Sequence, residues 1–344
     1  MRIGITGASG MIGWHLRCHL FAGDHQNVLT ADRETFDDPD RLDAFVREVD
    51  VLVHLAGMNR GEPDEVESVN LQLAERLVES LNRTEATPHL IFSSSTHRDR
   101  DTPYGRAKRK CAEIFNGWAK KSDAQFTTLI LPHVFGEHGR PFYNSVVHTF
   151  CYQLANNETS QLEQDTTLQL LHARHVARHI VEAGRQRQTG DIVIPGENLS
   201  VSELLKVLRK LAETYGANIV PDIRSQLILD LFNTYRSYLY PDHLPVNLQC
   251  HRDDRGDLFE LVKELNGGQV YISTTKPGIT RGEHFHTTKF ERFVVLKGVA
   301  RIGIRRMFSD EVQVFEVSGE RPQVMDIPTL HSHNLTNTGQ DELM

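Results

Sequence analysis

Near its N-terminus, directly after the apolar run 2–5, the chain reads Gly7-Ala8-Ser9-Gly10-Met11-Ile12-Gly13. Glycines placed where a strand passes into a helix permit a tight turn, let a pyrophosphate approach the backbone and allow close packing of helix on strand. The amino end of the helix also favours negative charge. We therefore predict that these seven residues form a dinucleotide-binding turn.

The first half of the chain alternates short apolar runs with amphipathic stretches. After the first run, apolar β-branched runs stand at 27–29, 51–55, 89–92 and 127–131. Helical patterns lie between them at 11–20, 40–49, 66–81 and 108–119. This alternation predicts an α/β fold, a Rossmann-type doubly wound parallel sheet with helices on both faces, in which ligands bind beyond the carboxyl ends of the strands.

A more helical region follows, and then an all-β one. The helical patterns at 146–155, 175–183, 202–215 and 227–239 are typical of a small substrate lobe. After Pro241, short runs at 269–274, 293–296, 300–304, 312–317 and 323–327 are separated by Gly, Pro and Asp. We predict two domains, residues 1–245 and residues 246–344, the second an all-β unit.

Bulk composition excludes several classes of protein. A net charge of -8 argues against electrostatic binding of nucleic acid. The chain has no apolar run of about eighteen residues and no signal-peptide pattern, so we expect a cytoplasmic protein without a membrane span. Disulfides and a thiolate metal site are not expected, because the four cysteines are scattered: Cys18, Cys111, Cys151 and Cys250.

The end of the second apolar run bears on cofactor choice. An acidic residue there usually accepts the ribose 2′-hydroxyl of NAD, whereas an arginine suits the 2′-phosphate of NADP. The sequence offers both, as Asp32 and Arg33. From these two residues alone NADH and NADPH both remain open.

A reducing centre is indicated further along. Tyr104 and Lys108 stand four residues apart, which places them on one helix face, and Ser95 ends the preceding apolar run. An ammonium beside a phenol is expected to lower the phenol's pKa. Such a tyrosine can protonate a carbonyl oxygen while a serine hydroxyl holds it.

Together these elements resemble the extended short-chain dehydrogenase/reductase superfamily, whose pattern also includes Val53-His54-Leu55-Ala56-Gly57 and Asn70. The resemblance implies that Ser95 binds the carbonyl, Tyr104 is the acid and Lys108 modulates it. Ser94 and Thr96 remain alternatives to Ser95. Besides the glycine turn, Asp32 and Arg33, the implied cofactor contacts are Leu55, Ala56, Gly57, Tyr104 and Lys108.

A second site is indicated near the C-terminus. The stretch from Gly278 to Gly298 resembles the first cupin motif, and 328–337 resembles the second, with Leu330 in place of a glycine. Histidines two apart on a strand project from the same face. Three imidazoles and a carboxylate suit zinc, our first expectation, and also iron, nickel or manganese. The predicted ligands are His284, His286, Glu291 and His333.

The combination of the two domains resembles the CapF-type enzymes of capsular and O-antigen polysaccharide biosynthesis. Family-like stretches stand at 54–60, 143–152, 253–256 and 276–280. The resemblance implies a zinc-containing homodimer that uses NADPH, with Arg33 at the family's arginine. Its cupin epimerises carbon 3 of a UDP-4-keto-6-deoxy-N-acetylhexosamine, and its reductase then reduces the carbon-4 ketone. His284 and His331 are both candidates for the epimerising base.

The UDP-sugar contacts are predicted at Asn59, Arg60, Arg140 and Asn144. Arg140 suits a diphosphate because a guanidinium binds its oxygens bidentately. The chain departs from the family at Ile130, His133 and Arg174-His175, which flank the sugar pocket and bear on the identity of the sugar. It also stops at Met344, where the family continues into another strand, so the cupin is expected to be truncated or to close differently.

Two other functions fit the same residues. One is a reductase without epimerase activity, whose cupin serves as a dimerisation module. The other is a regulatory protein that senses NADP(H) through the dinucleotide fold and assembles through the cupin. The combination of Ser95, Tyr104 and Lys108 favours an enzyme over a sensor.

Overall fold

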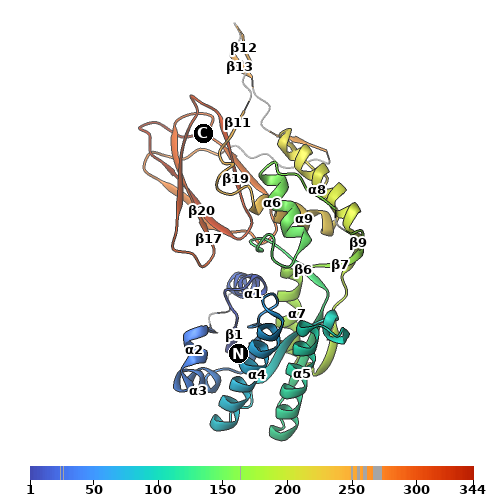
Figure 1. Ribbon diagram of the computed structural model, residues 1–344. Coiled ribbons are helices and arrows are strands. Elements are labelled where there is room, and N and C mark those ends of the chain that lie inside the picture. Colours follow the sequence, from blue (N-terminus) through green and yellow to red (C-terminus); the bar gives the residue numbers. More distant parts are fainter. Residues whose placement is uncertain are drawn as a thin grey trace. The chain divides into compact units, whose positions relative to one another are not determined.

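The computed structural model describes residues 1–23, 25, 27–162, 164–248, 251–253, 256–258, 262–265 and 273–344 (Figure 1). The chain divides into two compact units. The first unit comprises Met1–Thr149 and Leu162–Ser202, and the second comprises Phe150–Gln161 and Glu203–Met344.

The first unit is built on a six-stranded sheet in which every neighbouring pair is parallel. The strand order is β2 (Val28–Ala31), β1 (Ile3–Thr6), β3 (Val51–His54), β4 (His89–Ser95), β5 (Phe126–Leu131), β8 (Gly190–Val193). From β1 the chain passes to β2 on one side and then to β3 on the other. The carboxyl ends of β1 and β3 therefore flank the crevice in which such sheets bind their ligands.

Helices cover both faces of this sheet because successive strand residues point to opposite sides. Leu52 and Leu90 pack under one set of helices, whereas Val53 and Ile91 pack under the other. The first set is α3 (Pro39–Arg47), α4 (Pro63–Thr84) and α5 (Pro103–Ser122). The second set is α1 (Met11–Ala22) and α7 (Ala173–Gln186). The predicted doubly wound fold is confirmed, with the predicted strands and helices in place.

Several elements of the first unit were not predicted. They include β8 of the large sheet, α2 (Arg33–Asp37), a 3-10 turn η1 (Thr96–Asp99), and a three-stranded sheet in the order β6 (His133–Phe135), β7 (Thr167–His172), β9 (Glu197–Ser200). The strands β6 and β7 run parallel, and β7 and β9 run antiparallel. This small sheet carries the segment that follows Phe135, where several of the candidate substrate residues lie.

The predicted helical region consists of α6 (Val146–Ala155), α8 (Val201–Gly216) and α9 (Gln226–Ser237). The division into units does not fall at residue 245, because α9 and most of α8 belong to the compact unit that contains the C-terminal strands. Side chains that cross between helix and strand explain this grouping. Arg236 of α9 donates to the Ile327 carbonyl at 3.1 Å, and Arg292 donates to the Asn218 side chain at 2.8 Å.

The remainder of the second unit is all-β, as predicted. A four-stranded antiparallel sheet has the order β15 (Thr280–His284), β20 (His331–Asn337), β17 (Val299–Arg306), β18 (Gln313–Ser318). A three-stranded one has the order β11 (Val246–Asn247), β19 (Gln323–Ile327), β16 (Glu291–Val294). Ile302 and Ile304 of the first sheet share one core with Met325 and Ile327 of the second. Shorter pairs are β10 (Ile219–Val220) with β14 (Lys263–Glu264), and β12 (His251–Asp253) with β13 (Gly256–Leu258).

Some sequence predictions fall outside the described residues, namely most of the expected strand 269–274, Cys250, and Asp254 with Arg255 of a family-like stretch. The last residues of the chain pair with earlier ones: Leu343 with Thr275, and Met344 with Leu296 and Lys297. Among the described residues, no helix combines the length and apolar character needed to cross a bilayer.

Candidate functional site

The glycine turn after β1 leaves no room for larger residues. Gly7 has a φ of +70°, and a Cβ there would stand 2.6 Å from the Ala56 nitrogen. A Cβ on Gly13 would stand 2.3 Å from the Gly7 carbonyl oxygen. Gly10 begins α1 with no side-chain cap from the described residues and no acid in the first turn. The uncapped N–H groups and the helix dipole suit a pyrophosphate, so the turn fits a dinucleotide.

The loop after β3 lies directly against this turn. Ala56 donates its N–H to the Thr6 hydroxyl at 3.2 Å, and the same hydroxyl contacts Nδ1 of His54 at 2.9 Å. A Cβ on Gly57 would stand 2.3 Å from Oδ1 of Asn70, whose amide donates to the Met58 carbonyl at 2.6 Å. The predicted segment Leu55–Gly57 is thus held beside the cradle. The sequence did not single out Thr6, because a threonine in a strand is ordinarily only a β-branched residue.

Asp32 and Arg33 stand where β2 passes into α2. The Asp32 carboxylate caps α2 and accepts the Thr35 N–H at 2.9 Å. Hydrogen bonds from Thr35 hold the pKa of this carboxyl below its usual value. Arg33 is the exposed first residue of α2. The cap already occupies one oxygen of Asp32, whereas Arg33 is accessible to a ligand, and their cofactor roles remain predictions.

The structure gathers the predicted reducing residues at the end of β4. Lys108 is buried in α5 and donates to the Ser93 carbonyl at 2.8 Å, with its Nζ 5.6 Å from the centroid of the Tyr104 ring. The Ser95 hydroxyl, half-buried, accepts the His97 N–H at 3.2 Å. Ser94 is only 3% exposed, which favours Ser95 as the serine that a substrate can reach.

One electrostatic prediction for this site is wrong. Burial raises the pKa of Tyr104 to about 12 instead of the expected lowering by Lys108. Burial also lowers the pKa of Lys108 to about 8. The cost of burying a charge therefore shifts both pKa values more than the attraction between a phenolate and an ammonium does. At neutral pH the phenol keeps a proton that it can give to a carbonyl oxygen.

The predicted substrate residues lie in two segments that Arg60 joins. Its guanidinium donates to the carbonyls of Phe142, at 2.5 Å, and Tyr143. Arg140 lies with its guanidinium carbon 5.1 Å from the centroid of the Tyr143 ring. Asn59 and Asn144 are exposed, like Arg140. These contacts hold the 140–144 segment in place, and direct binding of a diphosphate by any of the four remains a prediction.

Two positions at which the chain departs from the family are buried or half-buried. Ile130 is 6% exposed in β5. The Nε2 atom of His133 lies 2.8 Å from the Ser145 hydroxyl, and burial lowers the pKa of this histidine to about 4. His133 is therefore a neutral hydrogen-bonding group at pH 7, which suits a contact with a sugar hydroxyl.

The four predicted metal ligands converge in the second unit. Oε2 of Glu291 lies 2.9 Å from Nε2 of His286, 3.1 Å from Nε2 of His333 and 3.9 Å from Nε2 of His284. Within the described chain, Oε2 of Glu291 and the Nε2 atoms of His286 and His333 are buried without a hydrogen-bond partner. Unsatisfied buried donor atoms around one point fit a divalent cation, and this N3O set suits zinc.

The backbone brings these ligands together in a different way from the one predicted. β15 ends at His284, after an irregularity at Gly282 and Glu283, so His284 and His286 do not share one strand. The carbonyl of His286 instead accepts the Leu330 N–H at 2.9 Å. Nδ1 of His333 stands 3.4 Å from the His331 carbonyl, which can only accept a hydrogen bond. That contact favours the proton on Nδ1 and leaves the Nε2 lone pair for a metal.

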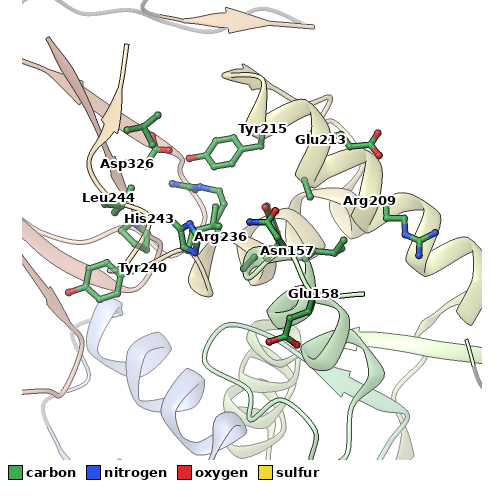
Figure 2. A pocket seen from close by; sticks show the side chains of 18 residues that line it. Asn157, Glu158, Arg209, Glu213, Tyr215, Arg236, Tyr240, His243, Leu244 and Asp326 are labelled. Atoms are coloured by element: carbon green, nitrogen blue, oxygen red, sulfur yellow. The ribbon is translucent and has the colours of Figure 1, made fainter. Parts of the chain in front are cut away.

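A cavity of about 540 Å³ lies elsewhere in the second unit (Figure 2). Tyr215, Arg236 and His243 are among the residues around it. Tyr240, also in its wall, packs its ring 4.6 Å from that of His331, which is fully buried. None of the four predicted substrate residues lines this cavity.

Burial of His331 favours the half-exposed His284 as the histidine accessible to a substrate.

Known proteins resemble the chain along its whole length. Residues 3–194 match the NAD dependent epimerase/dehydratase family, and residues 251–344 match the polysaccharide biosynthesis C-terminal domain. A UDP-2-acetamido-2,6-beta-L-arabino-hexul-4-ose reductase from Pseudomonas aeruginosa is 30% identical, over 100% of this chain and 93% of that protein. The capsular polysaccharide assembling protein CapF from Staphylococcus aureus is 30% identical, with a TM-score of 0.67 over 100% of this chain and 94% of that one.

A more distant structure, the UDP-glucose 4-epimerase of Thermus thermophilus in complex with NAD, is 18% identical and shares only the fold. The match covers 62% of this chain and 84% of that protein, with a TM-score of 0.55. The match of residues 3–194 and the parallel sheet with its glycine turn identify a nicotinamide-dependent protein of the extended short-chain type. More particularly, the chain belongs to the NAD dependent epimerase/dehydratase family and, within it, to the CapF-type enzymes of capsule biosynthesis.

Proposed function

We propose that the chain is a bifunctional nucleotide-sugar enzyme. Its C-terminal cupin epimerises carbon 3 of a UDP-4-keto-6-deoxy-N-acetylhexosamine, and its first unit reduces the carbon-4 ketone with NADPH. The product is UDP-2-acetamido-2,6-dideoxy-L-talose, on the pathway to UDP-N-acetyl-L-fucosamine. One observation carries the proposal: Tyr104 and Lys108 stand beside the end of β4, in a sheet whose glycine turn fits a dinucleotide. A relative 30% identical along its length, named as a reductase of such a sugar, supports it.

In the reductase, each residue has one task. The nicotinamide cofactor supplies a hydride to carbon 4 when bound. Ser95 holds the ketone oxygen, and Tyr104 gives it a proton. Lys108, anchored on the Ser93 carbonyl, places a positive charge near the phenol and stabilises the phenolate left after that transfer. Arg33 favours NADPH over NADH because its exposed guanidinium can meet a 2′-phosphate.

In the cupin, the proton on carbon 3 is acidic because it is α to the ketone. A base removes it where the enolate oxygen is stabilised, and a proton returned to the opposite face of carbon 3 completes the epimerisation. His284 and His331 are the two candidates for that base, and His284 is the more exposed of them. Zinc held by His284, His286, Glu291 and His333 would polarise the oxygen or shape the site. A homodimer is proposed by analogy with the CapF-type enzymes.

The test measures NADPH oxidation through its change in absorbance, with the UDP-4-keto-6-deoxy-N-acetylhexosamine as substrate. NMR then determines the configuration of the product. Oxidation that yields a talose-configured, 3-epimerised sugar is the expected result. Tight NADPH binding without oxidation would contradict the proposed substrate, and Ile130 and His133 would then be the first positions to explain the difference.

The alternative, a reductase whose cupin only mediates dimerisation, makes a different prediction in deuterium oxide. Protein incubated with the ketosugar and without NADPH should incorporate deuterium at carbon 3 if the cupin is an epimerase. Full reductase activity with no deuterium at carbon 3 would contradict the bifunctional proposal and support the alternative.

A further inference from the structure

A second cluster of histidine and glutamate is buried in the first unit. His15 lies in α1, Glu137 follows β6, and His172 ends β7, and all three are at most 3% exposed. Oε2 of Glu137 stands 3.0 Å from Nε2 of His172 and 3.5 Å from Nε2 of His15. These residues belong neither to the reducing centre nor to the predicted metal site. Burying a carboxylate is costly, so the cluster needs a reason.

The cluster resembles a metal site in composition, but the hydrogen bonding of His172 does not fit one. His172 caps α7, and its Nδ1 accepts the Arg174 N–H at 3.1 Å. A ring nitrogen that accepts a hydrogen bond carries no proton, so the ring proton of His172 is on Nε2. The Nε2 atom then has no lone pair for a cation, and its N–H lies next to the carboxylate instead. At His172 the contact with Glu137 is therefore one between a carboxylate and a ring N–H. His15 is joined to Glu137 by a hydrogen bond between its ring and the Glu137 backbone, with the carboxylate 3.5 Å from its Nε2.

This contact ties the cofactor helix to the segment that carries the candidate substrate residues. His15 stands one turn into α1, just after the glycine cradle, and Gly136 lies so close that a Cβ there would be 2.8 Å from Nε2 of His15. Trp14 packs its ring 4.9 Å from that of His138. The backbone from Gly136 onward leads to Arg140 and Asn144. A shift of Glu137 would therefore move both the start of α1 and the 140–144 segment.

We propose that Glu137 is a positioning residue that holds α1 at the distance from the 136–144 segment at which a dinucleotide and a sugar nucleotide bind together. The inference rests on the proposed use of a nicotinamide cofactor. Glu137 touches neither ligand and acts through His15, so its loss should weaken binding more than it slows the chemical step.

The experiment compares NADPH binding by wild type and by Glu137→Gln, with kcat and KM measured on the same proteins. Glu137→Gln keeps the shape and removes the charge. We expect NADPH to bind about tenfold more weakly, the size of one lost charged contact, with kcat changed less than about threefold. His172→Asn should behave in the same way, because the asparagine oxygen can still cap the Arg174 N–H.

The matched control is His89→Gln. His89 is equally buried and pairs with Thr127 at 2.7 Å, but it begins β4, at the amino ends of the strands and away from the glycine turn at their carboxyl ends. It should lower the melting temperature without changing the NADPH dissociation constant. Equal NADPH affinity in Glu137→Gln and wild type would overturn the inference, as would a metal ion that wild type holds and Glu137→Gln loses. A wild-type protein that binds neither NADPH nor NADH would instead overturn the proposed function.

Discussion

Each unit of the protein holds a cluster of histidine around one glutamate, and the two clusters differ in what the far ring nitrogens do. In the second unit, Nδ1 of His333 faces the His331 carbonyl, so Nε2 is free to bind a cation. In the first unit, Nδ1 of His172 accepts the Arg174 N–H, so Nε2 carries the proton. Distances around Glu291 and Glu137 are alike, at about 3 Å for the shortest contacts.

A set of metal-ligating residue types does not by itself identify a metal site. The partner of the second ring nitrogen fixes the tautomer, and the tautomer fixes whether the first nitrogen donates a proton or a lone pair. The two clusters also differ in their exposure to solvent. The side chain of His284 is 51% exposed, which lets a metal or substrate enter, whereas the cluster at Glu137 is closed.

The largest expected effect separates the chemistry of the two units. Tyr104→Phe removes the proton donor and should reduce NADPH oxidation by about 10²–10⁴-fold, the usual contribution of general acid catalysis. Binding of NADPH and deuterium incorporation at carbon 3 should stay as in wild type, because neither needs the phenol proton. Steady-state assays and NMR on one preparation check this. Loss of deuterium incorporation along with reduction would show that the two units do not act separately.

The next largest effect concerns which of the two clusters binds a metal. His333→Ala removes one of four ligands and should weaken metal binding by at least the roughly 10–100-fold that loss of an outer-shell partner costs. His172→Asn should leave the metal content unchanged. Metal analysis after dialysis against a weak chelator measures both variants beside wild type. A protein in which His172→Asn loses metal and His333→Ala does not would reverse our assignment of the two clusters.

The fold could be predicted, and candidate reducing residues could be named, because their signals are local. The glycine turn, the strand runs and the Tyr104–Lys108 spacing each lie within a short stretch, and the cupin ligands recur at fixed intervals. The cluster at Glu137 could not be predicted, because β6, β7 and α1 are distant in sequence and meet only in the folded unit. The direction of the Tyr104 pKa was also missed, since burial depends on packing that spacing does not reveal.

The smallest expected effect concerns pH. Burial lowers the pKa of His15 to about 4, and those of His54 and His148 to about 3. In the unfolded chain these rings titrate near 6.5, so between about pH 4 and 6.5 the unfolded state binds more protons than the folded one. Stability of the first unit should therefore be fully present above pH 6.5 and decrease as the pH falls through this window.

Each such histidine contributes at most about 1.4 kcal/mol per pH unit within the window. His15→Gln should thus reduce the pH slope of the free energy of unfolding by about that amount between pH 6 and 5. Urea unfolding of wild type and His15→Gln at several pH values measures the slope. The exposed His25, replaced in His25→Gln, is the control and should leave the slope as in wild type. An unchanged slope in His15→Gln would mean that the ring is already protonated beside Glu137, and the closed cluster would then be a full ion pair.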